Sequence, residues 1–209
     1  MPLSQFETVT DGKGQDLKLR LHAFAETYGL EACAPGRCSV LLLLELYAGA
    51  SSGTLNPGKV IDQIKVLEGL IPSRGLKKAT PFNRKELKGL WHQHYLESGL
   101  PSMAINLQKG LNIHGIPWLK QQIEGPRLGD VITAVDCHRI AHDAVVSNWG
   151  RLIEQKKLTG EWLIFAQHEG QNYYLCLGKH TTGDDVLRSR IDAVCLQEFA
   201  FLQDLLSPG

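Results

Sequence analysis

Two short apolar segments near the C-terminus constrain the fold more than any other feature of the sequence. Residues 162–168 read Trp-Leu-Ile-Phe-Ala-Gln-His, residues 172–178 read Asn-Tyr-Tyr-Leu-Cys-Leu-Gly, and Glu169-Gly170-Gln171 lies between them. Aromatic and aliphatic runs of this length, separated by a glycine-containing turn, predict an antiparallel β-hairpin. Because both strands are apolar on both faces, the hairpin needs cover on two sides or a further strand beside it.

Most of the remaining chain shows the 3–4-residue apolar spacing of helices. Seven helices are predicted. The first two span residues 16–28 and 39–48, the third begins at Asn56-Pro57, and the fourth runs from Asn83 to Gly99. The last three span residues 101–111, about 128–156 and 184–196. Residues 71–82 are predicted to form a loop, 112–125 give no assignable pattern, and 199–206 are expected to cap the core. The predicted fold class is α+β, a mainly helical single domain over 1–209 with a C-terminal β-hairpin (a small antiparallel sheet) packed on the helices. Within it we expect a helical part, 1–158, and a hairpin with C-terminal helices, 159–209.

Composition narrows the class of protein. The chain has 209 residues, of which 43% are hydrophobic and 21% charged, as in ordinary globular domains. Its formal net charge of zero excludes a protein that coats nucleic acid or anionic membrane with its whole surface. Residues 1–7 show no secretory pattern, and the longest apolar run, 40–44, falls far short of the roughly 20 residues of a membrane span. We therefore expect a cytoplasmic protein without a membrane partner. The five cysteines contain no CxxC pair, which predicts neither a disulfide framework nor a zinc ribbon.

The first candidate site is the His92-Gln93-His94 sequence. Two residues apart, the histidines share a face in a strand but lie about 200° apart in a helix. Asn83, three residues before Glu86, resembles a capping box and predicts a helix here. We therefore expect no chelation by this pair, with His94 on the core stripe and His92 toward solvent or a groove. The other members of that stripe are Leu87, Leu90, Trp91 and Tyr95.

His138 and His142 form a second candidate pair, because a spacing of four places both rings on one helix face. Metal sites and proton-transfer sites both use this spacing. The face also carries apolar residues: Val131, Val135, Val145, Trp149 and Leu152. In one interpretation both histidines are half-buried and hydrogen-bonded. In the other, His94, His138 and His142 converge where two helices meet and bind one divalent metal. If these three histidines do not converge, the cofactor is unknown, and acid–base catalysis by histidines requires none. The absence of an HExxH motif argues against a zincin protease.

His142-Asp143 is similar to the metal-binding pair of HD-type phosphohydrolases. The resemblance covers these two residues, and the neighbours that usually accompany the pair are replaced by Ala141 and by Ala144-Val145. It implies a His-ligated metal phosphohydrolase as an alternative function, and coincidence is the competing explanation.

The hairpin offers a third set of residues. His168 and Tyr173 are expected to lie opposite each other near the turn, and Lys179-His180 follows the second strand. In metal-independent ribonucleases such groups remove the 2′-hydroxyl proton, protonate the leaving oxygen and stabilise the phosphorane. In residue type the hairpin resembles the sheets of barnase-type and RelE-type toxin ribonucleases, which implies a toxin or defence ribonuclease. The alternative is that His168 is a turn residue and Tyr173 an interfacial aromatic.

A basic segment precedes the His92-Gln93-His94 sequence. Between residues 74 and 88, Glu86 is the only acidic residue among six basic ones, so the local charge is +5 and the rest of the chain carries −5. Such a cluster predicts phosphate binding, with a solvated face as the alternative. Aromatic residues within and after this segment would stack bases: Phe82, Trp91 and Tyr95. The basic residues are Arg74, Lys77, Lys78, Arg84, Lys85 and Lys88.

Two classes of function agree with these patterns. The first is a hydrolase, a nuclease or phosphohydrolase, that acts on RNA or a nucleotide. Its candidate catalytic residues are His94, His138, His142, His168, Tyr173 and His180. The second is a non-enzymatic module that binds a protein partner through the hairpin edge, where we then expect an exposed apolar patch. If the protein is this enzyme, at least three of six histidines should lie within about 10 Å of one another around one concave pocket that the basic segment borders. The six are His92, His94, His138, His142, His168 and His180. The sequence contains no GK[ST], GxGxxG or GxSxG motif. Their absence argues against an ATPase, a dinucleotide oxidoreductase and an α/β-hydrolase, respectively.

Overall fold

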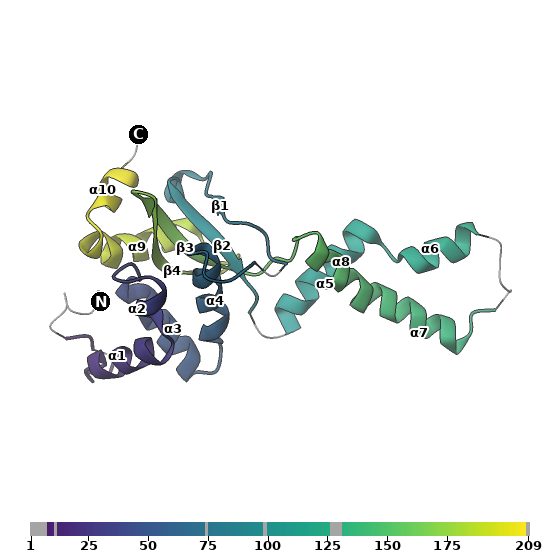
Figure 1. Cartoon of the computed structure of the whole chain (residues 1–209), viewed down its shortest axis with the longest axis horizontal. Helices are drawn as coiled ribbons and strands as arrows, with labels where there is room; N and C mark the ends of the chain where they lie inside the picture. The colour runs from purple at the N-terminus through teal and green to yellow at the C-terminus, as the bar shows by residue number, and fades with distance from the viewer. Residues whose placement is uncertain (1–7, 11, 74, 98–99, 126–130, 208–209) are drawn as a thin grey trace. The chain divides into compact units, whose positions relative to one another are not determined.

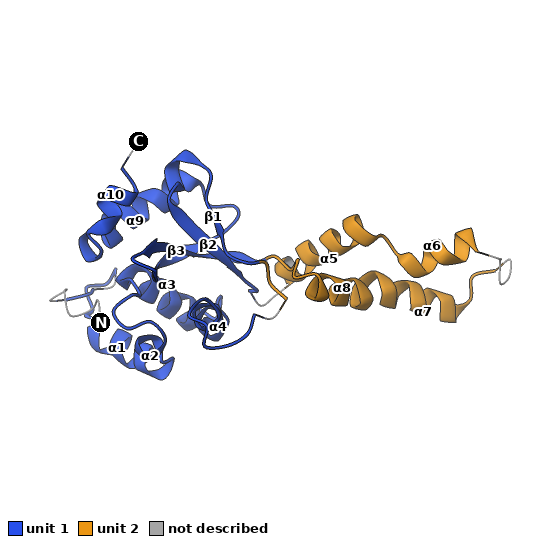
Figure 2. Ribbon diagram, turned by 45° about the horizontal axis from the view of Figure 1, so that its top comes forward, with its two compact units in different colours: residues 1–73, 78–97, 160–209 blue, residues 74–77, 98–159 orange. Residues whose placement is uncertain are grey.

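Figure 1 shows the computed structural model of the chain, which describes residues 8–10, 12–73, 75–97, 100–125 and 131–207. The chain divides into two compact units (Figure 2). Unit 1 comprises residues 1–73, 78–97 and 160–209, and unit 2 comprises residues 74–77 and 98–159. The predicted α+β class is confirmed. A single domain stays a prediction, because a compact unit need not fold independently.

Unit 1 is built on an antiparallel sheet. Among the described residues the sheet has four strands in the order β1-β2-β3-β4. Their bounds are Thr80–Pro81 for β1, Leu90–Tyr95 for β2, Glu161–His168 for β3 and Gln171–Gly178 for β4. The predicted hairpin is β3–β4, and β2 supplies the further strand that its apolar faces require. Glu169 and Gly170 form the two-residue turn with φ of 49° and 75°, and two positive φ angles match the twist of a hairpin.

Helices cover both faces of this sheet (Figure 1). One face carries α1 (Lys18–Thr27), α2 (Leu30–Cys33), α3 (Val40–Ser51) and α4 (Pro57–Leu67). The other carries the 3₁₀ turn η2 (Lys85–Leu87), α9 (Asp184–Glu198) and α10 (Phe201–Leu205). Local signals set the starts of two helices: the Ser39 Oγ accepts a hydrogen bond from Leu42 N at 3.0 Å, and Asn56 Oδ1 accepts one from Gly58 N at 3.0 Å.

The predicted helix from Asn83 to Gly99 is wrong. The segment contains η2 and then β2, whose residues pair with β3 from Leu90 opposite Ala166 to Tyr95 opposite Glu161. Gly89 separates the two with φ of 97°, a left-handed conformation that a helix interior does not contain. The capping signal is local, whereas pairing with β3 adds a full row of backbone hydrogen bonds and buries both faces of the strand.

Unit 2 is helical. Its elements are α5 (Leu100–His114), α6 (Pro117–Glu124), α7 (Ala134–His142), the π-helical turn η3 (Asp143–Ser147) and α8 (Asn148–Glu154). Helix α6 lies in the segment without an assignable sequence pattern and begins with Pro117 in its first turn. The predicted long helix is present from Ala134, and its predicted start at Leu128 lies outside the described residues. No helix of the described parts of the chain is both long and apolar enough to cross a membrane.

The apolar stripe on this long helix is exposed over its first part. Val131, Val135 and Val145 are 80, 59 and 41% exposed, and His138 and His142 are exposed as well. The π turn η3 adds a residue to one turn and so rotates the following part of the helix about its axis. Leu152, beyond the π turn, is the fully buried member of the stripe.

Candidate functional site

The structure brings three histidines together on one face of the sheet in unit 1. His92 and His94 point to the same side because β2 is a strand, and their ring centroids lie 5.3 Å apart. His180 follows β4, and its ring stacks on that of His94 at 5.7 Å. The indole of Trp162 lies 4.5 Å from His180 and 5.3 Å from His92, and Phe82 lies 4.6 Å from His92. We refer to these five residues as the histidine cluster.

One backbone carbonyl orients two of these rings. The Gly160 oxygen lies 2.7 Å from His94 Nδ1 and 2.9 Å from His180 Nε2. A carbonyl oxygen only accepts hydrogen bonds, so each of these nitrogens carries a proton. The Gly160 N–H also lies 3.4 Å from His94 Nδ1, but the shorter carbonyl contact decides the tautomer. In the neutral rings the lone pair is therefore on Nε2 of His94 and on Nδ1 of His180.

Gly160 is a glycine for a steric reason. A Cβ at this position would overlap the carbonyl oxygen of Tyr95, because the start of β3 passes close to the end of β2. The absence of a side chain thus allows the approach that presents the Gly160 carbonyl to both rings. Gly160 was not identified from the sequence, where it lies two residues before the predicted strand that begins at Trp162.

The histidine cluster extends from the core to the surface. His94 is 5% exposed and Trp162 8%, His92 is half-buried, and His180 is exposed. His92 Nε2 lies 3.2 Å from the Thr80 hydroxyl of β1. The Trp162 indole N–H is buried and has no hydrogen-bond partner among the described residues. A buried donor without a partner costs about 1–3 kcal/mol, which a bound anion or water would recover.

The structure describes five of the six basic residues of the predicted segment. Lys78, Arg84, Lys85 and Lys88 belong to unit 1 and Lys77 to unit 2, whereas Arg74 lies outside the described residues. Within unit 1 the later part adjoins the histidine cluster along the chain. Phe82 contacts His92 and Trp162, and Arg84 pairs with Asp184 at the start of α9 at 3.0 Å. Lys85 and Lys88 are exposed.

His168 and Tyr173 lie diagonally across the hairpin rather than directly opposite each other as predicted, with ring centroids 6.3 Å apart. Tyr173 pairs with Ala166, and His168 pairs with Gln171 beside the turn, at the other end of β3 from Trp162. Both rings contact Phe201 of α10, the His168 ring in a parallel stack at 4.2 Å and the Tyr173 ring at 4.7 Å. These contacts attach α10 to the sheet and favour the structural interpretation of the pair.

His138 and His142 share a face of α7 in unit 2, with ring centroids 6.4 Å apart. The neighbouring Asp143 is buried and accepts hydrogen bonds from Trp118 N at 2.8 Å and from Arg151 at 2.5 Å. Burial raises the pKa of the Asp143 carboxyl, but these hydrogen bonds outweigh it and hold the pKa below its usual value. Asp143 therefore anchors α6 and α8 to η3, and the HD resemblance gains no metal ligand from it.

A metal centre on His94, His138 and His142 is not found. Among the described residues no group of three or more His, Cys, Asp or Glu side chains is placed to hold a metal ion. His94 belongs to unit 1 and the other two to unit 2. The histidines that do cluster include His92, which the helix prediction had turned away from His94.

Comparison of the chain with known proteins and structures indicates no function, so the proposal below rests on the geometry of the site. No protein-family model matches the chain, and neither curated proteins nor solved structures gave a match.

Proposed function

We propose that the protein is a metal-independent ribonuclease whose acid–base groups are the histidines of the histidine cluster. The observation that carries this proposal is the pair His94–His180, stacked at 5.7 Å with complementary tautomers fixed by one carbonyl. Two groups that act on oxygens of one phosphodiester each need to come within about 3 Å of them. Rings at this separation meet that requirement.

The reaction that suits this pair is transfer of the phosphoryl group to the 2′-oxygen. His94 accepts the 2′-hydroxyl proton on Nε2, and the 2′-oxygen attacks phosphorus. The bond from phosphorus to the 5′-oxygen breaks, and protonated His180 donates its Nδ1 proton to that oxygen. The products are a 2′,3′-cyclic phosphate and a 5′-hydroxyl. DNA lacks the attacking hydroxyl and is not cleaved.

Neighbouring groups suit the charge of this substrate. The buried Trp162 indole N–H offers a hydrogen-bond donor to a phosphate oxygen, and negative charge on that oxygen grows in the transition state. Lys85 and Lys88 are exposed in the segment that follows Phe82, and they would hold backbone phosphates on either side. Cleavage should therefore weaken as the salt concentration rises.

The test compares cleavage of one RNA and the DNA of the same sequence, in EDTA, by the wild type and by variants. We expect RNA cleavage alone, and a loss of about 10²-fold or more in His180→Ala, since a general acid contributes about 10²–10⁴-fold. His180 is exposed, so its removal leaves the core intact. The matched control is His138→Ala/His142→Ala on α7, which should cleave like the wild type. Equal cleavage by His180→Ala, or cleavage of the DNA, would refute the proposal.

A non-enzymatic protein-binding module is the second candidate, and one observation favours it. Of the fourteen large apolar side chains that are exposed among the described residues, eleven lie in unit 2. Those in unit 1 are Leu19, Leu70 and Val186, so the apolar surface does not gather beside the hairpin edge. That edge, β4, is bridged in part by residues 37–39 through Tyr174. Wild-type protein without RNA cleavage would favour this candidate.

A further inference from the structure

Two lysines of unit 2 that are far apart in the sequence lie on neighbouring backbone segments. Beyond α8 the chain runs beside residues 75–77. Leu158 donates its N–H to the Gly75 carbonyl at 3.3 Å and accepts a hydrogen bond from Lys77 N at 3.4 Å. Lys157 directly precedes Leu158, so this pairing brings Lys77 and Lys157 to the same part of unit 2.

Helix α5 adds a third lysine to this pair. Lys109 Nζ donates a hydrogen bond to the Lys157 carbonyl at 2.5 Å. One turn earlier on α5, the fully buried Asn106 donates to the Thr159 carbonyl at 2.7 Å and accepts from Thr159 N at 2.9 Å. These contacts fix α5 against the segment after α8 and hold the Lys109 ammonium in place. We refer to Lys77, Lys109 and Lys157 as the lysine cluster.

The lysine cluster concentrates positive charge at the Lys109 ammonium. Burial and the positive charges of Lys77 and Lys157 lower the pKa of Lys109 to about 8, since a neighbouring like charge disfavours the charged form. An anion bound among the three ammonium groups would offset this repulsion and favour the charged form again. The arrangement therefore suits an anionic ligand.

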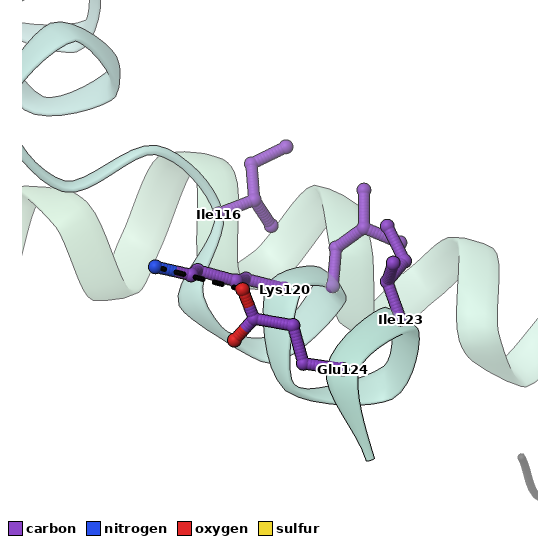
Figure 3. Close-up of a pocket in the computed structure, with 5 residues that line it drawn as sticks. Ile116, Lys120, Ile123 and Glu124 are labelled. Atoms are coloured by element: carbon purple, nitrogen blue, oxygen red, sulfur yellow. Dashed lines mark ion pairs between the residues drawn. The ribbon is translucent and has the colours of Figure 1, made fainter. Parts of the chain in front are cut away.

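The carboxylates of unit 2 do not balance its positive charge. In the sequence, unit 2 contains nine Lys and Arg residues and five Asp and Glu residues, so its net charge is +4 and that of unit 1 is −4. Two of these carboxylates are paired with other cations. Glu124 binds Lys120 of the same helix at 3.8 Å (Figure 3), and Asp143 binds Arg151 at 2.5 Å. Positive charge remains in excess for an external anion.

The open position of the lysine cluster indicates the kind of anion. Lys77 and Lys157 are exposed, and Lys109 is half-buried. Small ligands usually bind in concave pockets, whereas an extended chain of phosphates reaches several cations on an open surface. Lysine binds phosphate as a point charge and, in contacts of this kind, reads no base sequence. The backbone of a single-stranded nucleic acid has this chemistry.

We propose that the lysine cluster binds the phosphate backbone of single-stranded nucleic acid, without regard to base sequence. The proposal goes beyond the ribonuclease activity, because the lysine cluster belongs to unit 2 and the histidine cluster to unit 1. Backbone binding needs no 2′-hydroxyl, so single-stranded DNA, which the proposed ribonuclease does not cleave, should bind as well. A binding assay with DNA therefore tests this proposal separately from the cleavage reaction.

The test is fluorescence anisotropy of a labelled oligothymidylate with the full chain, over a range of salt concentrations. We expect Lys77→Gln/Lys157→Gln to bind about 20-fold more weakly near 0.1 M salt, and its slope of log affinity against log salt to be shallower by about 1.4, at about 0.7 for each lost phosphate contact. Both lysines are exposed, so their removal leaves the core intact. The matched control, Lys13→Gln/Lys120→Gln, removes two exposed positive charges outside the cluster and should bind like the wild type.

A second measurement observes the cluster itself. NMR of ¹³C-labelled lysine should show the pKa of Lys109 rising from about 8 toward 10.5 when the oligothymidylate is added. Equal losses of affinity in the two double variants would overturn the proposal, because binding would then follow net charge alone. So would a pKa of Lys109 that inorganic phosphate raises and the oligothymidylate does not, because the cluster would then serve a small ligand.

Discussion

The largest stability effect that we predict comes from one carboxylate in unit 1. Glu68 accepts two hydrogen bonds from the Arg37 guanidinium, at 2.8 and 2.5 Å, and one from the Tyr174 hydroxyl at 2.6 Å. Arg37 also donates to the Asn172 carbonyl at 2.8 Å. The network joins the residues before α3, the end of α4 and β4. Glu68→Ala removes the centre of this network.

The expected magnitude follows from burial. The Arg37 and Glu68 side chains are 13 and 15% exposed, and removing one partner of a buried pair costs about 3–5 kcal/mol because the other charge stays buried. Some contact with water and the retained Asn172 carbonyl reduce this cost. We therefore expect Glu68→Ala to lower the free energy of unfolding by about 3 kcal/mol at pH 7, measured by urea denaturation. Arg37→Met combined with Glu68→Ala should cost less than the two single changes added together.

The pH dependence gives an independent check. Burial raises the pKa of Glu68, but the hydrogen bonds from Arg37 and Tyr174 outweigh burial and lower it. A lowered pKa adds stability above the ordinary value for glutamate, and this stability is lost as the pH falls through the folded-state value. The difference between wild type and Glu68→Gln should be largest at pH 7 and shrink below about pH 4. A cost under about 1 kcal/mol for Glu68→Ala, or a difference that grows in acid, would refute this reasoning.

Three further predictions concern other single sites. Gly160→Ala forces a methyl group against the Tyr95 carbonyl and should lower the free energy of unfolding by about 2 kcal/mol; an unchanged urea midpoint would contradict the close approach. Burial raises the pKa of Glu198 to about 7 despite a hydrogen bond from Val40 N. The stability of the wild type should therefore fall as the pH rises from about 4.5 to 7, and that of Glu198→Gln should fall less. Thermal-unfolding temperatures that change with pH in the same way in both proteins would argue against this. Burial, with neighbouring lysines, lowers the pKa of Lys109 to about 8, and NMR of ¹³C-methylated lysines should find it there rather than near 10.5.

The hairpin and the helix starts were predictable because their signals are local. The turn at Glu169-Gly170 and the caps at Ser39 and Asn56 act within a few residues, and the structure contains each of them. The strand β2 was not predictable in this way. Its partner, β3, begins at Glu161, far along the chain, whereas the misleading capping pattern at Asn83 lies next to it.

The error in β2 also determined how much of the candidate site was found. His94 and His180 were among the predicted catalytic residues, but the helix assignment separated His92 from His94. A strand assignment would have joined them, and Gly89 was the residue that argued for it. The Gly160 carbonyl has no signature in a side-chain pattern, because its role depends on the backbone approach to Tyr95.

The central claim, catalysis by the histidine cluster without a metal, is tested most directly by the chemistry of the cleaved ends. Mass spectrometry of an RNA oligonucleotide after incubation with the protein in EDTA identifies those ends. The geometry of His94 and His180 predicts 2′,3′-cyclic phosphate and 5′-hydroxyl ends from the wild type, and almost none from His180→Ala. Ends with 5′-phosphate and 3′-hydroxyl that form only when a divalent metal is added would contradict the account.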